Sequence, residues 1–481
     1  MRRMTRRAFL KRAAAASAAI PLVALAGTNA SGKVIGANDA IRVGIAGIHG
    51  QGSAHIEQYL GLHGAQVTYL IDPDRNLFES RTKTVREKAG NEPTCVQDIR
   101  RALDDKNLDV ISIATPNHWH SLITIWACQA GKDVYVEKPL SHNVSEGRRC
   151  IDAARKYGRL VQHGTQQRSS ELRANEVAAV QSGKYGKLLV AKGYCCKPRW
   201  SIGRKDAAPP PVDLAFDLWL GPAPEQPYHA NLVHYNWHWF WDFGNGDIGN
   251  QGVHEIDVAR WAIKEATLPS KVWSLGGRFA GDDQGQTPNM QMAVFQFGDV
   301  LLLFEVRGLV GKHQGYDLRV ENELYTDQGM IKEGRFHPKN GGAPEKLAQL
   351  DVKVTPGGAW GSFLHAVRSR KVEDLNAPVE DGHYSSALCH LANISYRLGE
   401  RVPFSKKAKT LGDNREVVDS FMNLEQNLKV VGVRLEEATY QLGRTLAFDA
   451  KKERFVGEGA ELANPFLSRQ YRQPFVVPEN V

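Results

Sequence analysis

Apolar residues follow two different patterns along this chain, and the change between them falls near residue 166. Between residues 41 and 166, short apolar runs rich in Val and Ile alternate with stretches in which apolar residues recur at helical spacing. The runs read IRVGIAGI, AQVTYLID, LDVISIATP, DVYVEKP and RLVQHGTQ. Strands that alternate with helices usually form one parallel sheet, because each helix returns the chain to the same edge. This half therefore predicts a parallel, doubly wound α/β sheet.

After residue 166 the apolar runs follow one another with turns between them instead of helices. They read GKLLVAKGYCC, SKVWSLGGRF, MQMAVFQFGD, VLLLFEVRG and YDLRVENELYTDQGMI, which predicts a mostly antiparallel sheet. A Pro- and Trp-rich insert, residues 197–243, follows the first run, and helical spacing returns over 361–400 and 413–443. We therefore predict four regions: an N-terminal segment 1–30, a parallel-sheet domain 38–165, a second α/β domain 166–405, and a C-terminal helix with an extended tail 406–481.

The net charge of +8 would suit a protein that binds nucleic acid, but most of it lies in the first 30 residues. These hold six basic residues and no acidic one, so the rest of the chain carries a net charge of only +2. No long basic stripe follows, and nucleic-acid binding is not expected. The six cysteines lack C-x-x-C spacing and give no indication of a zinc site. Adjacent Cys195 and Cys196 can form a strained disulfide or be two thiols on opposite strand faces, and we favour the thiols.

Residues 1–30 resemble a twin-arginine export signal. The paired arginines of TRRAFLK precede a mildly apolar run, AAAASAAIPLVALAG, which is too short and too rich in Ala for a stable membrane span. The alternative is a frayed basic N-terminus. The resemblance implies that the twin-arginine export machinery carries the folded chain to the periplasm or the cell exterior.

The turn after the first strand, GIHGQG at residues 47–52, is typical of dinucleotide binding. Gly47 and Gly52 occupy two of the three glycine positions of the G-x-G-x-x-G fingerprint. His49 stands at the middle position, where a side chain hinders close approach to a diphosphate unless the loop shifts, and Gly50 can supply the missing freedom. The residues expected to hold the cofactor here are Gly47, Ile48, His49, Gly50 and Gly52.

Asp72 ends the next strand, 20 residues after Gly52. A carboxylate at this place can accept hydrogen bonds from the ribose hydroxyls of the adenosine half. This position favours NAD, although nearby Arg75 leaves NADP open. The alternative is that Asp72 only caps a helix or turn.

Polar stretches also follow the third and fourth strands, as ATPNHWH at residues 114–120 and VEKP at 136–139. Both lie where parallel sheets bind ligands, at the carboxyl ends of strands. With the glycine turn, these N-x-x-H and E-K-P boxes, VQHGTQ and DLWLGPAP resemble the Gfo/Idh/MocA oxidoreductase family. The resemblance extends over nearly all of residues 41–400 and implies a Rossmann domain followed by an α/β domain with an open, mostly antiparallel sheet.

The resemblance implies that the nicotinamide half lies against these strand ends. The residues expected there are Thr115, Pro116, Asn117, His120, Glu137, Lys138 and Gln166. Lys138 would be the active-site lysine, because an ammonium beside the reacting oxygen stabilises a developing alkoxide. His120 is expected to hold the loop and His118 to contact substrate. No carboxylate or cysteine set accompanies these two histidines, so no metal is predicted.

The stretch GNGDIGNQGVHEID, residues 244–257, is dense in polar residues and glycine. It can be a capped helix start, a metal site or an active-site wall, and its spacing matches no metal motif. By the resemblance, His254 is the acid/base, and a carboxylate is expected four residues before it. Asn250 stands there instead and supplies no charge, so Asp247 is the candidate to take over from one turn away. We expect a helix to open near Gly252.

Two catalytic functions fit these features. The first is an NAD(P)-dependent oxidoreductase that acts on a sugar, polyol or glycoside by hydride transfer, with a tightly bound cofactor. The second is a glycoside hydrolase that uses NAD in transient oxidation, elimination, water addition and re-reduction. Residues expected to bind the carbohydrate are Lys138, His118, Arg168, Trp239, Trp241, Asn250 and His254. A non-enzymatic sugar-binding protein is a third alternative, and a homo-oligomer is expected through the open sheet.

Overall fold

The computed structural model describes residues 27–28, 34–35, 40–311, 319–405 and 408–481. The predicted export signal lies outside the described residues except for residues 27–28. Those two residues form β1 (Gly27–Thr28), which pairs antiparallel with β2 (Val34–Ile35). None of the helices in the described ranges is long and apolar enough to cross a membrane.

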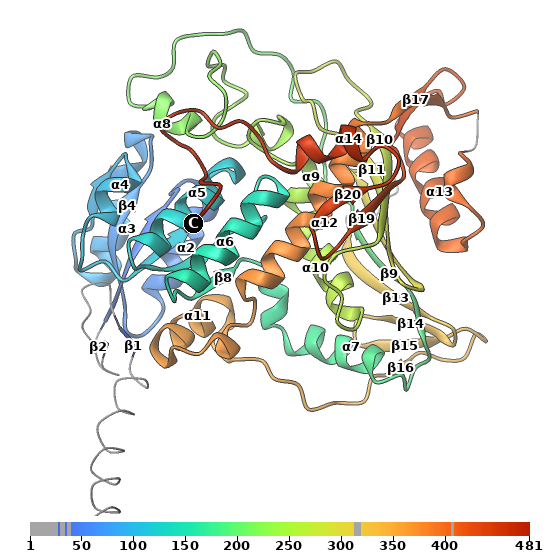
Figure 1. Cartoon of the computed structure of the whole chain (residues 1–481), viewed down its shortest axis with the longest axis horizontal. Coiled ribbons are helices and arrows are strands. Elements are labelled where there is room, and N and C mark those ends of the chain that lie inside the picture. The colour runs from blue at the N-terminus through green and yellow to red at the C-terminus, as the bar shows by residue number, and fades with distance from the viewer. Residues whose placement is uncertain (1–26, 29–33, 36–39, 312–318, 406–407) are drawn as a thin grey trace, which may run out of the picture.

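The first domain is a six-stranded sheet in which every pair is parallel and the order is β5-β4-β3-β6-β7-β8 (Figure 1). Its strands are β3 (Ile41–Ala46), β4 (Ala65–Ile71), β5 (Thr94–Val96), β6 (Val110–Ile113), β7 (Asp133–Val136) and β8 (Val161–His163). β6 and β7 are buried along their whole length, as expected for central parallel strands covered on both faces. The predicted doubly wound sheet is confirmed.

Helices cover both faces of this sheet. They are α2 (Gly50–Leu60), η1 (Arg75–Leu77), α3 (Phe78–Ala89), α4 (Ile99–Leu103), α5 (Asn117–Gln129) and α6 (Val144–Lys156). Ile56 of α2 and Val85 of α3 share one apolar cluster with Phe363 of α11 (Gly358–Ser369). Leu122 of α5 and Ile151 of α6 belong to the cluster on the other face. The sheet is therefore fixed in a rigid three-layer domain, with its strand ends free to hold a ligand.

The second domain is built on a twelve-stranded sheet with the main order β16-β15-β14-β13-β9-β12-β11-β10-β18-β17. The strands are β9 (Leu188–Cys195), β10 (Lys271–Gly277), β11 (Met290–Phe297), β12 (Val300–Arg307), β13 (Val320–Thr326), β14 (Gly329–Lys332), β15 (Arg335–Pro338), β16 (Glu345–Lys346), β17 (Glu400–Pro403), β18 (Thr439–Leu442), β19 (Leu446–Asp449) and β20 (Arg454–Val456). Among the described strands of this sheet, only β9 and β12 pair in parallel, so the prediction of a mostly antiparallel sheet is confirmed.

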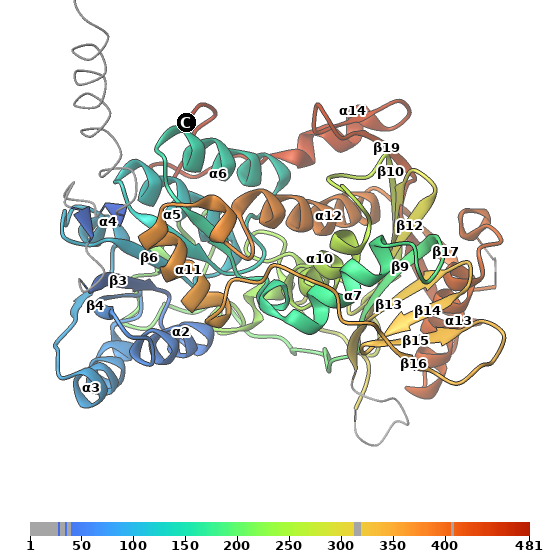
Figure 2. The same cartoon turned by 90° about the horizontal axis from the view of Figure 1, so that it is seen from below.

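The two faces of this sheet carry different helices (Figure 2). α7 (Glu171–Gln181), α10 (Gly252–Ala262) and α12 (Val379–Arg397) pack in the cluster between the sheet and the first domain. α13 (Arg415–Val430) covers the opposite face. The remaining short helices are α8 (Phe216–Leu220), η2 (Gln166–Ser169), η3 (Asn236–Trp239), α9 (Gly246–Asn250), η4 (Val372–Asp374), η5 (Lys409–Leu411), α14 (Ala460–Ala463) and η6 (Asn464–Leu467).

The C-terminal region differs from the prediction of one long helix and a tail. The helix predicted over 413–443 ends at Val430, and β18 begins at Thr439. The apolar residues beyond 430 serve a strand because β18 pairs with both β10 and β17. The tail then crosses back, and Phe475 packs in the core of the first domain.

The insert between β9 and β10 runs across the end of the first domain. Leu214 forms an antiparallel bridge with Asp74, and the amide of Ala215 donates to the Pro73 carbonyl at 2.9 Å. Trp219 and Phe243 lie in a small apolar cluster of the insert itself. The insert is thus a folded unit that roofs the strand ends.

Candidate active site

A cavity lies where the strand ends of the first domain meet the insert and α9. Its lining residues from the first domain are Ala46, Gly47, His49, Gly50, Gln51, Ile71, Asp72, Pro73, Gln97, Asp98, Ile99, Ala114, Thr115, Pro116, Asn117, Trp119, His120, Ile123, Glu137 and Lys138. Those from the other segments are Leu218, Trp219, His234, Tyr235, Trp237, His238 and Asn250. Most of the predicted cofactor residues are therefore brought together around one space.

Two properties of the glycine turn suit a bound dinucleotide. Gly47 has φ +79°, and a Cβ on Gly52 would lie 1.7 Å from the Gly47 carbonyl oxygen, so neither position tolerates a side chain. A Cβ on Gly50 would meet nothing within 4 Å, which shows that the turn faces open space. α2 starts here without a side-chain cap, and its first amides are free to bind an anion.

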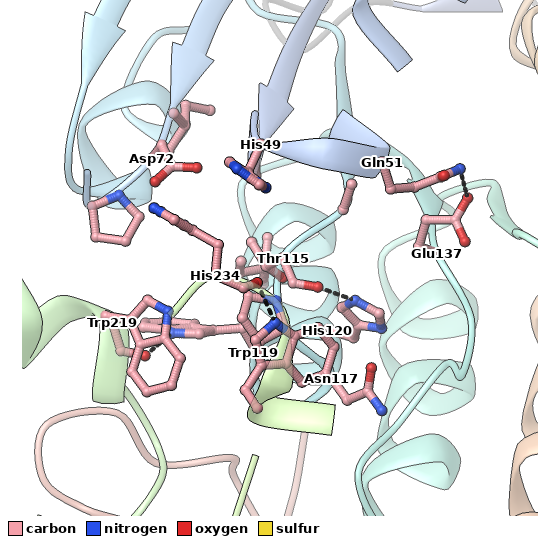
Figure 3. A pocket seen from close by; sticks show the side chains of 18 of the residues that line it. His49, Gln51, Asp72, Thr115, Asn117, Trp119, His120, Glu137, Trp219 and His234 are labelled. Atoms are coloured by element: carbon pink, nitrogen blue, oxygen red, sulfur yellow. Dashed lines mark hydrogen bonds between the residues drawn. The ribbon is translucent and has the colours of Figure 1, made fainter. Parts of the chain in front are cut away.

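His49 occupies the middle glycine position and precedes α2. Its ring stacks on the ring of His234 from the insert, with centroids 4.4 Å apart and planes 6° apart (Figure 3). Burial lowers the pKa of His49, and the neighbouring His234 and Arg81 lower it further. The side chain that departs from the fingerprint thus contacts the roof of the cavity.

Asp72 lines the cavity and also braces the glycine turn. One carboxylate oxygen accepts from the Ile48 amide at 2.9 Å, and the other accepts from the Asp74 amide at 2.9 Å. Burial raises its pKa to about 6, although these two amides oppose the shift. Both predicted roles are compatible with this position, because each oxygen retains a lone pair for a ribose hydroxyl.

Glu137 is the centre of a buried hydrogen-bond network. Its Oε1 accepts from Gln51 at 3.0 Å, from His55 at 3.2 Å and from Gln166 at 3.0 Å. Burial opposes its ionisation, but the His55 hydrogen bond and the nearby Lys138 outweigh burial and lower its pKa. A fixed negative charge therefore stands beside the lysine.

Lys138 reaches across the domain boundary to α9. Its Nζ donates to the backbone carbonyl of Asn250 at 2.9 Å and to the Asn250 side-chain oxygen at 3.3 Å. Burial lowers the pKa of Lys138, while Glu137 and Asp247 oppose the shift. This contact joins the cofactor strand ends to the predicted catalytic helix.

The pairing predicted around His254 is not formed as expected. Asn250 donates to Asp247 at 3.2 Å, and Arg199 donates to Asp247 at 2.8 Å, so these side chains bond one another and Arg199. The side chain of His254 has no hydrogen-bond partner among the residues that the structure describes. Burial and the charge of Lys138 lower its pKa to about 3, so the imidazole is neutral at pH 7.

The expected helix near Gly252 is present as α10, but a helical turn precedes it. Gly246 and Gly249 do not prevent this turn, because α9 is helical over Gly246–Asn250. Gly246 has φ +70° and starts α9, and Gly252 lies close to Phe304, so tight packing explains the glycines.

Arg168, predicted to bind the carbohydrate, does not line this cavity. Its guanidinium is buried and forms a bidentate pair with Asp257 at 2.8 and 3.0 Å. It also forms an ion pair with Asp381 at 3.0 Å. Ser385 also donates to Asp257. Part of the polar stretch 244–257 therefore forms a buried ion pair, through Asp257 of α10.

Three other predicted substrate residues also lie elsewhere. His118 bonds the Trp219 carbonyl at 3.0 Å and anchors the insert. Trp239 is buried with the Arg199 guanidinium 5.4 Å from its ring. Trp241 lines a separate cavity near the C-terminal tail. Of the three tryptophans at positions 237, 239 and 241, Trp237 lines the main cavity.

The nicotinamide-side predictions mostly hold in position. Thr115, Pro116 and Asn117 line the cavity, and Asn117 donates to Asn245 at 3.0 Å. His120 bonds the Thr115 and Pro139 carbonyls at 2.8 and 2.7 Å, as expected of a residue that holds the loop. Gln166 does not line the cavity but donates a hydrogen bond to Glu137, which does.

Several residues in or beside the cavity were missed from the sequence. Gln51 and His55 are four residues apart on α2 and meet Glu137 together, and this i, i+4 spacing was a usable signal. His234, Tyr235 and His238 belong to the insert, and no local pattern places them over strands that lie far away in the sequence. Within the described ranges, no group of three His, Cys, Asp or Glu side chains could hold a metal ion, and the cysteines there are free.

Two family models match the chain. The first is described as an oxidoreductase family with an NAD-binding Rossmann fold and matches residues 41–165. The second, the C-terminal alpha/beta domain of the same family, matches residues 180–293.

Curated relatives resemble the chain at about a quarter identity. A glycosyl hydrolase family 109 protein of Shewanella pealeana is 25% identical over 225 residues, which is 43% of this chain and 49% of that protein. The chain thus aligns with about half the length of that relative. A myo-inositol 2-dehydrogenase of Thermotoga maritima is 25% identical over 295 residues, covering 60% of this chain and 74% of that protein.

Solved structures share the fold. The WlbA dehydrogenase from Bordetella pertussis, in complex with NADH and UDP-GlcNAcA, aligns with a TM-score of 0.53 at 15% identity over 73% of this chain and 94% of that one. A levoglucosan dehydrogenase in complex with NADH aligns with a TM-score of 0.53 at 18% identity over 73% and 95%. At such low identity the likeness shows the fold alone.

Proposed function

Because the chain belongs to the Gfo/Idh/MocA oxidoreductase family, we propose that it is an NAD(P)-dependent oxidoreductase that acts on a sugar, polyol or glycoside by hydride transfer. The observation that carries the proposal is the contact of Lys138 with Asn250 at the end of the cavity that starts at the glycine turn. This contact sets a cation from the first domain against a polar wall from the second.

The dinucleotide site is supported by the residues present. Gly47 and Gly52 allow the tight backbone packing of the turn, Gly50 faces open space, and Asp72 lines the cavity just after β4. A bound nicotinamide dinucleotide supplies the hydride acceptor or donor. Glu137 fixes a negative charge near the nicotinamide half, and Thr115 offers a buried hydroxyl that has no hydrogen-bond partner within the described part of the chain.

Lys138 orients the substrate and stabilises charge on the reacting oxygen. Its Nζ has two acceptors on Asn250 and retains one N–H for a substrate oxygen. When an alcohol is oxidised, its hydroxyl proton must leave. His254 is the proposed acceptor: it lies outside the lining of the cavity but close enough to Lys138 and Glu137 for their charges to act on it. Asn250 holds the ammonium but takes no proton, so the relay differs from one built on a carboxylate.

The test is to purify the protein, extract and identify any bound nucleotide, and incubate the protein with a panel of sugars, polyols and aryl glycosides. Stoichiometric NADH formation without glycoside cleavage is the expected result. A protein that carries and binds no nicotinamide nucleotide and oxidises none of the panel would overturn the proposal.

The second candidate is an NAD-dependent glycoside hydrolase. It is favoured by the similarity to the glycosyl hydrolase family 109 protein and by the insert that roofs the cavity, which suits a cofactor recycled without release. Release of the aglycone with only trace NAD and no net NADH would establish this function in place of net oxidation.

Export through the twin-arginine pathway and a homo-oligomeric state are further parts of this proposal. Export is supported by the paired arginines and the apolar run in residues 1–30. An oligomer is supported by exposed Met422 and Val430 on α13. Fractionation of cells with Arg6→Lys and Arg7→Lys together tests export, and light scattering of the purified protein tests the oligomer.

A further inference from the structure

Two histidines from distant segments face each other in the middle of the cavity. His49 follows the glycine turn and His234 belongs to the insert, and their rings stack at 4.4 Å. In Figure 3 His49 lies between Asp72 on one side and Glu137 on the other. A glycine at position 49 could not make this contact.

The insert is fastened so that His234 keeps this place. Its Nε2 bonds the Asp74 carboxylate at 3.0 Å, and the Arg75 amide donates to the Asp213 carbonyl at 3.1 Å. Gln97 also donates to the Asp213 carbonyl, at 3.3 Å. These contacts tie the insert to the end of β4, beside the adenosine side of the cavity.

The position of the pair matches the middle of a dinucleotide. Gln97, Asp98 and Ile99 line the cavity on the adenosine side, whereas Glu137 and Lys138 line it on the nicotinamide side. The diphosphate that links the two halves of the cofactor has to cross the space between them. We propose that His49 and His234 bind this diphosphate and take up a proton when it binds, an inference that rests on the proposed cofactor site.

The charges around the pair support proton uptake. His49 faces His234 and Arg81, which disfavour its charged form, and Asp74, which favours it. Asp74 also bonds His234, and buried Asp72 lies behind the turn and bonds the Ile48 and Asp74 amides. The ring of His49 has no hydrogen-bond partner in the described ranges, so a ring N–H is available to a phosphate oxygen. The negative charges of a bound diphosphate would favour the protonated form of a ring that it contacts.

The sign of the pH dependence follows from this linkage. A ligand that raises the pKa of a group binds more tightly when that group is already protonated. Dinucleotide affinity should therefore increase as the pH falls from 8 to 6. A turn with glycine at position 49 depends on backbone amides, which do not titrate.

Calorimetric titration with NAD and with ADP-ribose, in two buffers of different ionisation enthalpy at pH 6 and pH 8, tests the proposal on protein stripped of nucleotide. We expect uptake of roughly half to one proton and roughly tenfold tighter binding at pH 6. AMP, which lacks the diphosphate, should show neither effect. If nucleotide stays bound during purification, its release after dilution should be about tenfold faster at pH 8.

His49→Gly and His234→Gln should each weaken the pH dependence and the proton uptake, and the double variant should abolish both. His229→Gln, in the same insert but outside the cavity, is the matched control and should keep both. Tight binding without proton uptake, or with uptake retained in the double variant, overturns this inference and leaves the proposed function standing. Failure of the wild-type protein to bind any dinucleotide at either pH overturns both.

Discussion

The glycine turn at residues 47–52 and helix α9 form two walls of one cavity, and each departs from its expected motif at a single residue. In the turn, His49 replaces a glycine and adds a ring contact to the insert. In α9, Asn250 replaces a carboxylate and leaves Lys138 with neutral acceptors. The first departure adds a titratable group to the cofactor side, whereas the second removes a charge from the catalytic side.

The difference teaches that a departure from a motif is interpreted through its spatial partner. His49 alone suggests a weakened nucleotide site, but its partner His234 makes it part of the roof. Asn250 alone suggests a broken relay with His254, but its partner is Lys138. The following changes test the two walls, from the largest expected effect to the smallest.

The largest effect is expected from removal of Lys138, which should lower catalysis and leave the cofactor side intact. Lys138→Ala should lower kcat by about a hundredfold to a thousandfold, because a preorganised cation is lost from the reacting oxygen. Steady-state kinetics with the best substrate of the panel, together with NAD titration, measures this. Lys106→Ala, an exposed lysine of the same domain, is the control. A kcat within about twofold of the wild type would remove Lys138 from the chemistry.

A methyl group at the tightest contact of the glycine turn should destabilise the protein and weaken dinucleotide binding. Gly52→Ala sets a Cβ against the Gly47 carbonyl, where it would lie 1.7 Å from the oxygen, so the backbone must move. We expect about 1–3 kcal/mol lower stability and at least about tenfold weaker dinucleotide binding.

Urea denaturation measures the stability of this variant. Gly50→Ala is the matched control for stability, because its Cβ meets nothing within 4 Å. Equal stability of the two alanine variants would contradict the geometry of the turn.

Restoring the missing carboxylate should change the pH profile of the catalytic wall. In Asn250→Asp, a negative charge beside Nζ favours the charged ammonium and raises the pKa of Lys138 by about one unit or more. Activity that needs the ammonium is lost as the pH rises through this pKa, so the alkaline limb should move to higher pH by a similar amount.

The pH dependence of kcat/KM measures this shift. Asn250→Ala removes the side-chain acceptor without adding charge and should not move the limb upward. A limb at the same pH in wild type and Asn250→Asp would show that Lys138 does not govern it.

The smallest effect is expected from a change at Glu255, a buried carboxyl on α10, and it concerns the pH dependence of stability. Burial raises the pKa of Glu255 to about 8, although Gln251 opposes the shift. Because the folded state holds this proton more tightly than the unfolded state, the stabilisation is complete below about pH 4.5 and is lost as the pH rises through 8.

Glu255→Gln should therefore lose less stability between pH 5 and pH 8 than the wild type, by more than about 1 kcal/mol. Urea denaturation at the two pH values measures the difference. Dinucleotide affinity should not change, because Glu255 does not line the cavity. Parallel stability curves would contradict a protonated Glu255.

Much of the fold could be predicted from periodicity. Apolar runs of β6 and β7 mark buried strands, and the alternation of strand and helix specifies a parallel sheet. The helix predicted over 413–443 was too long because apolar residues of β18 satisfy a helical pattern until their sheet neighbours are known. Periodicity reports that a side chain is buried but not what buries it.

The candidate site shows the same limit. The glycine turn and the E-K-P box were identified because each is continuous in sequence and has one residue type per role. The ion pair of Arg168 could not be predicted because its partner Asp257 lies 89 residues away. In the sequence, a polar residue near a strand end looks the same whether it faces a ligand or an ion pair.

The sequence by itself determined the parallel sheet, the glycine turn and the lysine at the end of β7, because local spacing and backbone sterics decide these. Only the tertiary structure decided that Asn250 holds Lys138, that His234 stacks on His49 and that Arg168 is buried. Such pairs depend on the path of the insert and on how the two domains pack. Residues more than a hundred positions apart, such as Lys138 and Asn250, leave no local pattern of their contact.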